Sequence, residues 1–444
     1  MKVLVINAGS SSLKYQLYDM TDEAVLAAGR VERIGMESAI LTHEPAGKPE
    51  IREVNEILDH TAAIRRVLSV IVHKEHGVLS SVDDIQAVGH RVVHGGETFR
   101  SSVLVTSEVK QEIKRLFDLA PLHNPAHLMG IQAVETNMPN VPQAVVFDTA
   151  FHQTMERHAY LYPIPLALYR RHKIRKYGFH GTSHMYVSRR AAEFLGRPLA
   201  ELKIVTCHIG NGASVAAVKG GKSIDTSMGM TPLEGLMMGT RSGDLDPAVV
   251  PFAMGKEDLT IGEVSSMLNK HSGLIAISGI SSDMREIQEA MEEGNANAKL
   301  AFEMYEYRLR KYIGAYAAAM NGVDAIVFTA GVGENSWLLR ARTCLNLTYL
   351  GVEIDPEANL VRSKEDRRIS TPNSKVDVLV IPTNEELVIA RETYGLIRGE
   401  TAHGSDARTH APTRAPTPSD APTHAPTPTP TPSGKAERSP VEQT

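Results

Sequence analysis

The chain opens with a strand, a turn of small residues and a second strand, and this arrangement most constrains its fold. The apolar run 3–6 leads into the turn 7–12, Asn-Ala-Gly-Ser-Ser-Ser, and residues 13–18 read as a returning strand. Small residues let the backbone approach a ligand closely, hydroxyl and amide groups donate hydrogen bonds, and Lys14 adds a positive charge. The pattern predicts a phosphate-binding turn. It differs from a Walker A loop, which leads into a helix.

A weaker copy of this arrangement starts at residue 204. Residues 204–218 read as strand, turn and strand, with Asn7 aligned to His208 and Gly9 aligned to Gly210. Each copy would open a separate α/β half, and two such turns facing each other would hold a polyphosphate from both sides. Glycine-containing hairpins are common, so chance similarity is the alternative explanation.

Strand and helix patterns alternate along the body of the chain. This alternation favours an α/β fold with mixed sheets, and 444 residues suffice for two or three domains. The expected strands are 3–6, 13–18, 87–93, 144–147, 204–207, 215–218, 325–329 and 377–381. The expected helices are 107–118, 183–195, 285–293, 297–320 and 384–397.

The end of the chain has a different composition. Residues 401–444 are rich in Thr, Ala, Pro, Ser and His, and no large aliphatic or aromatic residue lies between Ile397 and Val441. Such a segment cannot bury enough apolar surface to offset the entropy lost on ordering. We therefore expect a disordered tail over 401–444.

Composition excludes several classes of function. A net charge of -5 argues against nucleic-acid binding and against a polybasic membrane signal. An aromatic content of 5% argues against a surface on which bases stack. The sequence has no run of transmembrane length, no secretion signal and only two cysteines, both in apolar surroundings typical of buried thiols. A cytoplasmic protein is expected.

Five polar elements each follow an apolar, strand-like run. They are Asn7, the segment 94–96, Asp148, His208 and the glycine-rich segment 331–335. Ligands of open α/β sheets bind beyond the carboxyl ends of the strands. Five such elements on one edge therefore predict a single site, in which the small residues of 331–335 would let an adenosine lie against backbone.

Arg91 and Asp148 are candidate members of that site. Strand alternation places Arg91 on the same face as Val93, and a guanidinium beside an apolar wall suits a small carboxylate with a short alkyl end. An exposed arginine on an edge strand is the alternative. Asp148 is suited to accepting a hydrogen bond or proton, or to arranging a metal. An N-cap or Asx turn explains Asp148 equally well.

Arg241 and His180 are the other polar candidates. Arg241 lies in the glycine-rich loop 239–247, where a guanidinium is suited to an anion, and pairing with Asp244 or Asp246 is the alternative. His180 precedes the expected helix 183–195, whose N-terminus favours anions. His180 would donate to a phosphoryl oxygen, and a capping or core histidine is the alternative.

A magnesium site is expected at the start of the last helix. Thr383 and Glu386 match a capping box, which leaves Glu385 free to hold Mg²⁺ directly or through water. Interaction with the helix dipole is the alternative use of Glu385. Pairs of histidines four residues apart lie on a strand pattern or enclose a proline or glycine, which argues against zinc.

Together these segments resemble the acetate kinase family over roughly residues 1–400. The resemblance rests on seven motifs in order: Asn7–Lys14, His90–Gly96, Phe147–His152, Tyr177–His184, His208–Gly212, Thr240–Asp244 and Thr383–Glu386.

The resemblance implies a two-lobed, duplicated ribonuclease H-like fold of the sugar kinase, Hsp70 and actin superfamily, with the nucleotide in a cleft between the lobes. The first lobe would comprise 1–150 with the last helix, 385–400, and the second 151–384. It also implies a homodimer that transfers a phosphoryl group reversibly from ATP to acetate, with Mg²⁺ or alternatively Mn²⁺. A propionate kinase and a nucleotide-driven switch like Hsp70 or actin are the competing interpretations.

The resemblance also implies a role for individual residues. Arg91, Asp148, His180 and Arg241 would form the catalytic set, and Asn7 and Glu385 would position the metal. The acyl pocket would be formed by Arg91 with Val93, Leu122, Phe179 and Pro232. The nucleotide would be bound by Lys14, His208, Ile209, Gly210, Asn211, Gly212, Asp283, Met284, Arg285, Gly331, Val332, Gly333, Glu334 and Asn335.

Overall fold

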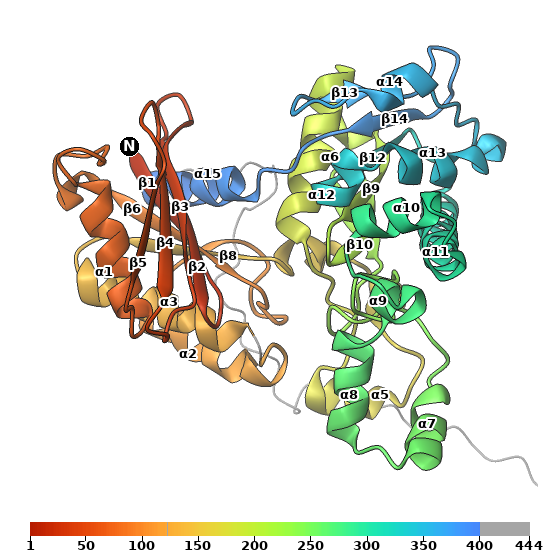
Figure 1. The fold of residues 1–444 in the computed structure, drawn as a ribbon, viewed down its shortest axis with the longest axis horizontal. Helices are drawn as coiled ribbons and strands as arrows, with labels where there is room; N and C mark the ends of the chain where they lie inside the picture. Colours follow the sequence, from red (N-terminus) through yellow and green to blue (C-terminus); the bar gives the residue numbers. More distant parts are fainter. Residues whose placement is uncertain (122, 400–444) are drawn as a thin grey trace, which may run out of the picture. The chain divides into compact units, whose positions relative to one another are not determined.

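Two β-sheets with helices packed on them form the described part of the protein (Figure 1). The computed structural model describes residues 1–121 and 123–399. Leu122 of the expected acyl pocket and the expected disordered tail, 401–444, lie outside the described residues. The α/β class predicted from the alternation of strands and helices is confirmed.

The first sheet has the strand order β5-β4-β3-β2-β1-β6-β8-β7. As predicted, the chain folds back after the first turn, because β1 and β2 pair antiparallel with Asn7 opposite Lys14. Strand β1 runs parallel to β6, and β6 runs parallel to β8. The bounds are β1 Lys2–Ala8, β2 Ser12–Asp19, β3 Ala24–Glu32, β4 Ala39–Pro45, β5 Ile51–Asn55, β6 Ala87–Val92, β7 Val103–Leu104 and β8 Gln143–Phe147.

The second sheet has the strand order β11-β10-β9-β12-β14-β13. Strands β9 and β10 pair antiparallel with His208 opposite Ser214, while β9, β12 and β14 run parallel. The bounds are β9 Lys203–Ile209, β10 Ala213–Lys219, β11 Lys222–Thr226, β12 Ala325–Thr329, β13 Arg367–Arg368 and β14 Asp377–Val380.

The two sheets repeat one topology. In each, three successive strands of the chain pair antiparallel, and two later strands run parallel to the first of the three, which is β1 or β9. The resulting orders are β3-β2-β1-β6-β8 and β11-β10-β9-β12-β14. Asn7 and His208 both occupy the next-to-last position of the first strand of their sheet. The weak sequence repeat therefore reflects a duplicated fold. Strands β4 and β5, which are among the strands not predicted, extend the first sheet beyond β3 and have no counterpart beyond β11 in the second.

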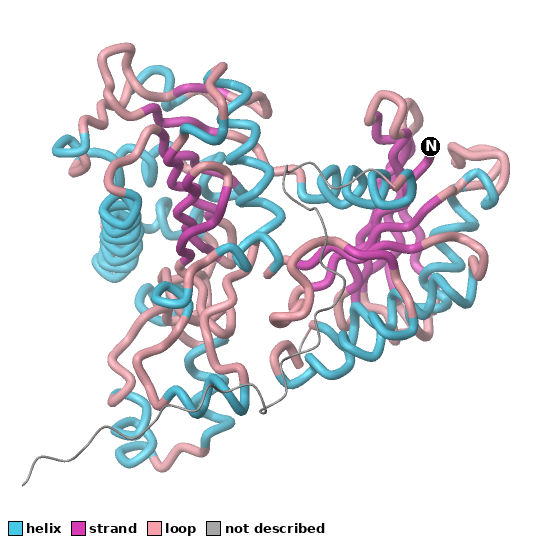
Figure 2. The backbone as a smooth tube through the Cα atoms, turned by 180° about the vertical axis from the view of Figure 1, so that it is seen from behind, coloured by secondary structure: helices cyan, strands magenta, loops and turns pink. Residues whose placement is uncertain are grey.

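Helices cover both faces of each sheet, as Figures 1 and 2 show from opposite sides. Buried residues of α1 and α3 pack on one face of the first sheet and those of α15 on the other. Helix α6 covers one face of the second sheet, and α10, α11 and α13 the other. None of the described helices is long and apolar enough to cross a membrane.

All five expected helices are present, although the first ends as a 3-10 turn at 116–118. The bounds are α1 His60–Ile71, α2 Ser107–Arg115, α3 Asn124–Asn137, α4 Arg157–Tyr160, α5 Leu166–His172, α6 Gly181–Leu195, α7 Val249–Glu257, α8 Ile261–Lys270, α9 Gly273–Ser278, α10 Met284–Glu292, α11 Ala296–Met320, α12 Ala330–Asn335, α13 Trp337–Leu345, α14 Pro356–Leu360 and α15 Glu385–Arg398.

The predicted capping box at the start of α15 is wrong. The N-cap is Asn384, whose side-chain oxygen accepts a hydrogen bond from the backbone N–H of Leu387 at 3.0 Å. The hydroxyl of Thr383 instead donates to the hydroxyl of Ser183 at 2.9 Å. An asparagine is as good an N-cap as threonine, and the tertiary contact to Ser183 decides between them.

Thr383 and Asn384 are consecutive, but Thr383 contacts elements that belong to the second sheet and Asn384 contacts a strand of the first. Thr383 contacts Ser183 of α6, and its backbone N–H donates to Glu334 of α12 at 3.4 Å. The side chain of Asn384 accepts from the hydroxyl of Tyr18 on β2 at 3.3 Å. The chain therefore passes from the second sheet to the first between these two residues.

Candidate active site

The predicted site begins at the carboxyl ends of parallel strands. Asn7 lies near the end of β1, Arg91 near the end of β6, and Asp148 directly after β8. Because β1, β6 and β8 are parallel neighbours, these residues share one edge of the first sheet. His208 lies near the end of β9, and 331–335 follows β12 at the matching edge of the second sheet.

Arg91 and Asp148 form a buried ion pair. The Arg91 Nη2 atom lies 2.6 Å from Asp148 Oδ2, and Nε lies 3.1 Å from Oδ1, so two nitrogens of the guanidinium donate hydrogen bonds to one carboxylate. The Asp148 side chain is 1% exposed and that of Arg91 24%. Burial alone would lower the pKa of Arg91, but the carboxylates of Asp148 and Glu385 outweigh it and raise that pKa.

This pairing excludes the alternatives for both residues. Asp148 is neither an N-cap nor an Asx turn, and Arg91 is not an exposed arginine on an edge strand. The third nitrogen of Arg91, Nη1, donates to no atom of residues 1–121 and 123–399. It is therefore the part of the guanidinium left for a ligand.

His180 is held at the start of α6 next to Asp148. It is the N-cap residue of α6, with φ +55°, but its side chain makes no capping bond. Its Nδ1 instead lies 2.8 Å from the hydroxyl of Ser214, and its ring stacks on His208 with the centroids 4.1 Å apart. Gly181 donates its N–H to the Asp148 carbonyl at 3.0 Å, where a Cβ would stand 2.2 Å from that oxygen.

Arg241 approaches the same place from the second sheet. A Cβ on Gly212 would lie 3.3 Å from Arg241 Nη1 and 3.7 Å from His180 Nε2, so both side chains border the turn 208–212. Arg241 Nη1 donates to the Pro232 carbonyl at 3.3 Å. Burial lowers the pKa of Arg241.

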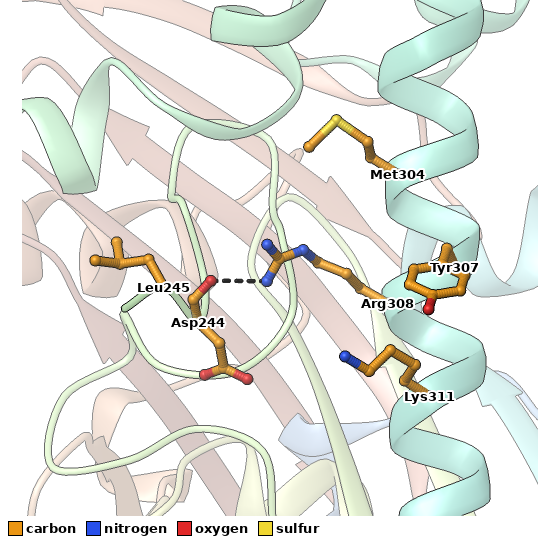
Figure 3. Close-up of a pocket in the computed structure, with 6 residues that line it drawn as sticks. All are labelled: Asp244, Leu245, Met304, Tyr307, Arg308 and Lys311. Atoms are coloured by element: carbon orange, nitrogen blue, oxygen red, sulfur yellow. Dashed lines mark hydrogen bonds between the residues drawn. The ribbon is translucent and has the colours of Figure 1, made fainter. Parts of the chain in front are cut away.

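Neither aspartate in the same loop pairs with Arg241. Asp244 accepts from the N–H of Gly235 at 2.8 Å and from the hydroxyl of Tyr312 at 2.5 Å. Its backbone carbonyl accepts from Arg308, at a pocket of about 410 Å³ beside α11 (Figure 3). Asp246 caps its own turn by accepting from the N–H of Ala248 at 2.9 Å. The alternative interpretation of Arg241 as an internal ion-pair partner is therefore wrong.

The expected nucleotide loops adjoin this cluster. The Asn211 carbonyl accepts from Gly239 at 3.3 Å, and a Cβ on Gly239 would stand 2.3 Å from the Asn211 side chain. A Cβ on Gly331 would meet nothing within 4 Å, so open space adjoins its backbone. Asp283 is the N-cap of α10 and holds the exposed Arg285 at 2.6 Å.

Sequence reasoning missed Arg340, which supports one of these loops. Its side chain is 1% exposed and donates to the side chain and carbonyl of Asn359, each at 2.8 Å. It also donates to the carbonyls of Gly333 and Glu334, each at 2.9 Å. Burial, followed by the nearby charge of Arg367, lowers its pKa to about 10. No motif marks Arg340 in the sequence.

Replacing Arg340 by methionine is expected to lower the free energy of unfolding by about 3 kcal/mol, because buried carbonyls lose their donors. It should also raise KM for ATP, since the segment 333–334 loses its anchor. Urea unfolding and steady-state kinetics measure both. Arg342→Met is the matched control on α13, because Arg342 is 39% exposed and pairs with α11. Equal KM values for ATP in the two variants would contradict the assignment.

Three of the four apolar pocket residues are described. Val93 and Phe179 are 5% and 2% exposed and belong to one buried apolar cluster, although Val93 follows the last residue of β6. The ring of His94 lies against Phe179 with the centroids 5.7 Å apart. The carbonyl of Pro232 is the acceptor for Arg241, which brings the apolar and charged groups together.

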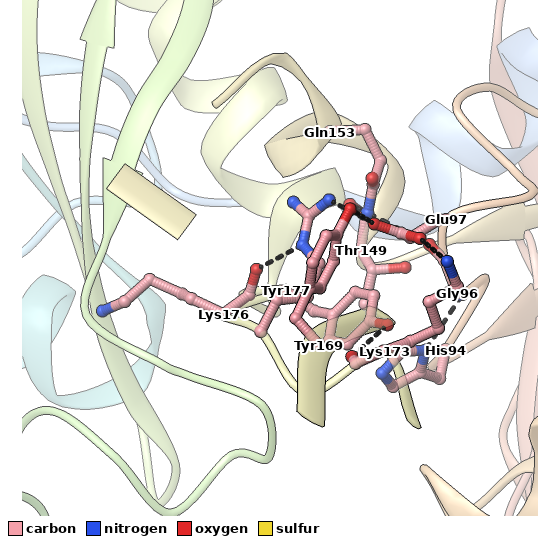
Figure 4. Close-up of polar contacts among 10 residues, drawn as sticks. His94, Gly96, Glu97, Thr149, Gln153, Tyr169, Lys173, Lys176 and Tyr177 are labelled. Carbon is pink, nitrogen blue, oxygen red and sulfur yellow. Dashed lines mark hydrogen bonds and ion pairs between the residues drawn. The ribbon is translucent and has the colours of Figure 1, made fainter. Parts of the chain in front are cut away.

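A polar cluster around Glu97, also missed from the sequence, fixes the loop after β6 (Figure 4). The Glu97 carboxylate accepts from the hydroxyl of Tyr169 at 2.9 Å and from Arg175 at 3.1 Å, and Lys173 lies 3.5 Å away. These partners belong to the segment that leads to Phe179. The cluster therefore holds the Val93 and Phe179 segments together.

Asn7, Lys14 and Glu385 gather at the start of α15. Asn7 shares the face of β1 with Val3 and Val5, whose side chains pack on α15. Lys14 of β2 lies directly opposite Asn7 in the antiparallel pair. Burial and then the charge of Asp148 outweigh Arg91 and raise the pKa of Glu385 to about 7. Such a half-buried carboxylate favours a nearby cation, and carboxylate and amide oxygens suit Mg²⁺. These residues fit the expected ion, although the described residues hold no group of three or more His, Cys, Asp or Glu suited to a metal.

Comparison with known proteins agrees with this geometry. The model of the acetokinase family matches residues 2–391. An acetate kinase from Symbiobacterium thermophilum is 62% identical over 398 residues, which cover 90% of this chain and 100% of that protein. The crystal structure of Porphyromonas gingivalis acetate kinase superposes with a TM-score of 0.86 at 48% identity, covering 89% of this chain and 99% of that one. A propionate kinase from Francisella tularensis subsp. tularensis SCHU S4 superposes with a TM-score of 0.83 at 41% identity, with the same coverage. The chain belongs to the acetokinase family.

Proposed function

We propose that this protein is an acetate kinase, which transfers the γ-phosphoryl group of ATP to acetate and reversibly forms acetyl phosphate and ADP. The observation that carries the proposal is the convergence of Arg91, Arg241 and His180 on one place, with the buried apolar residues Val93 and Phe179 nearby. Acetate is already ionised at pH 7 and needs no strong base. Catalysis must therefore come from positioning and from neutralising charge, which this set of residues supplies.

Each catalytic side chain has a separate task in this proposal. The free Nη1 of Arg91 and the guanidinium of Arg241 bind the acetate carboxylate and then the charge that develops during in-line transfer. His180 donates through Nε2 to the moving phosphoryl group. Asp148 supports the attacking carboxylate by fixing the orientation of Arg91. Val93, Phe179 and Pro232 enclose the methyl group, and Leu122, which the family resemblance also assigns to this pocket, lies outside the described residues.

The nucleotide is assigned to the loops of the second sheet and the metal to the first. Residues 208–212, 283–285 and 331–335 bind ATP or ADP, and Lys14 contacts its phosphates. Asn7 and Glu385 hold Mg²⁺, for which Mn²⁺ is the alternative. When bound, the ion neutralises charge on the phosphate oxygens. We assign 1–150 and 385–400 to one lobe and 151–384 to the other. The family resemblance supports a cytoplasmic homodimer.

The proposal predicts Mg-ATP-dependent formation of acyl phosphate from acetate in preference to propionate and butyrate. Purified protein is incubated with each acid in parallel, and acyl phosphate is trapped with hydroxylamine. A preference for propionate would make the protein a propionate kinase. Failure on all three acids, with ATP still bound, would favour a nucleotide-driven switch.

Val93→Ala provides the matched variant for this assay. Removing two methyl carbons from this buried position frees more than the volume that one additional methylene needs, and one methylene is worth about 1–3 kcal/mol in an apolar pocket. The ratio of kcat/KM for propionate to that for acetate should therefore rise by about 10-fold. An unchanged ratio would remove Val93 from the acyl pocket.

A further inference from the structure

A chain of four hydrogen-bonding side chains runs from His180 into the core beneath α6. His180 Nδ1 lies 2.8 Å from Ser214 Oγ, and the same oxygen lies 2.7 Å from His184 Nε2. His184 Nδ1 lies 2.7 Å from Thr206 Oγ1, which can donate to the Ala216 carbonyl at 3.5 Å. Ser214, His184 and Thr206 are all 0% exposed.

The fold places these residues in line. His184 lies one helical turn after His180 on α6. On the sheet below, Thr206 and His208 are two residues apart on β9 and therefore share the face that α6 covers. On β10, Ser214 pairs with His208 and Ala216 pairs with Thr206. The apolar contacts of the same helix with the same strands continue beyond His184. The polar chain is therefore enclosed by packed core.

One proton at Ser214 links the two histidines. A serine hydroxyl donates one hydrogen bond, and a neutral imidazole carries a proton on one nitrogen only. Ser214 lies between two imidazole nitrogens, so it donates to one of them and accepts from the other. If Ser214 donates to His180 Nδ1, the His180 proton is on Nε2, which borders Gly212. If Ser214 donates to His184, the His180 proton is on Nδ1, and neutral Nε2 can donate nothing.

We propose that Thr206, His184 and Ser214 are positioning residues that hold the proton of neutral His180 on Nε2, where it faces the transferring phosphoryl group. Thr206 donates to His184 Nδ1, His184 Nε2–H donates to Ser214, and Ser214 donates to His180 Nδ1. No proton is transferred along the chain, and only the direction of its hydrogen bonds is fixed. The inference rests on the proposed phosphoryl-binding role of His180.

The hydrogen-bond distances favour this direction of the chain. The competing direction needs the hydroxyl of Thr206 to donate to the Ala216 carbonyl, and 3.5 Å is long for such a bond. Burial, together with the neighbouring His208 ring, also lowers the pKa of His180 well below its ordinary value. The neutral ring then donates through Nε2 only if its proton is on that atom.

The tautomer can be read directly from the full-length protein. Nitrogen-15 NMR of protein labelled in its histidine rings separates protonated from unprotonated ring nitrogens, and spectra of His180→Gln and His184→Gln identify the two rings. We expect a protonated Nε2 and an unprotonated Nδ1 for His180, with the same pattern for His184. A protonated Nδ1 on His180, with or without a protonated Nε2, would overturn the proposal. This readout does not depend on turnover, so it stands apart from any failure of the acetate kinase assignment.

Kinetics test whether Ser214 acts through His180. Ser214→Ala should lower kcat by about 10-fold with little change in either KM, as is typical for residues that orient a catalytic group. In a His180→Ala background, the same change should have no further effect on kcat. Equal factors in both backgrounds would mean a merely structural role and would overturn the proposal. Ser188→Ala is the control, because it removes a buried hydroxyl from α6 outside the chain and should leave kcat unchanged.

Discussion

Arg241→Ala is expected to lower kcat by about 10³-fold or more while the protein keeps its fold and most of its stability. The guanidinium contacts a carbonyl oxygen and the sulfur of Met238 but no carboxylate of the described residues. Its removal therefore leaves no buried charge without a partner. What is lost is the positive charge beside Gly212 and His180, which only the transferring group would use.

Acyl phosphate formation and thermal unfolding of the same preparations test this expectation. Arg241→Lys keeps the charge but loses the planar fork, so it should recover only part of the activity. Arg308→Ala is the control for disturbance of the loop, because Arg308 binds the Asp244 carbonyl on the far side of the same segment. Comparable losses of kcat in Arg308→Ala and Arg241→Ala would assign the effect to loop structure instead of charge.

Arg91→Ala should abolish turnover to a similar degree but also destabilise the protein, by about 3–5 kcal/mol. The difference from Arg241 comes from Asp148, which is 1% exposed and would be left as a buried carboxylate without its partner. The charge of Arg91 opposes the rise in the pKa of Glu385, and this opposing effect would also be lost. Denaturant unfolding at pH 7 measures the stability, and the hydroxylamine assay measures the turnover.

The double variant Arg91→Ala/Asp148→Ala separates the two effects. Removing both charges should restore much of the lost stability, because neither is left unpaired, but none of the activity. If the double variant is as unstable as the sum of the two single variants, the ion pair is not what stabilises this edge of the sheet. Recovery of turnover would contradict the role proposed for Arg91.

The sequence indicated the fold wherever a local pattern was strong. The apolar run before Asn7 and its echo before His208 predicted the first strands of both sheets, and the duplicated strand order confirms that repeat. Strands β3, β4 and β5 were missed because their residues lack a clear apolar period, and the shorter strands β7, β11 and β13 were missed as well. The cap of α15 was misjudged because Thr383 and Asn384 are equivalent locally, and only the contact with Ser183 distinguishes them.

The site was predictable as a set of residues but not as a set of contacts. Arg91 and Asp148 each follow a recognisable strand, yet their pairing depends on β6 and β8 being neighbours. The supporting residues were not predictable at all. Arg340, Glu97 and Ser214 lie in ordinary helix, loop and strand patterns, and their importance comes from partners distant in the sequence.

The junction between Thr383 and Asn384 has a mechanical consequence. Because one residue is tied to Ser183 and the next to Tyr18, any rotation of the second sheet relative to the first must be absorbed at this crossing by the ψ torsion of Thr383 and the φ torsion of Asn384. Glu385 follows at once and moves with the first sheet, as Asn7 does, whereas His180 and Arg241 move with the second. If the two sheets rotate relative to each other, the torsions at the Thr383–Asn384 peptide change, and so does the distance between the groups assigned to the metal and those assigned to the phosphoryl group.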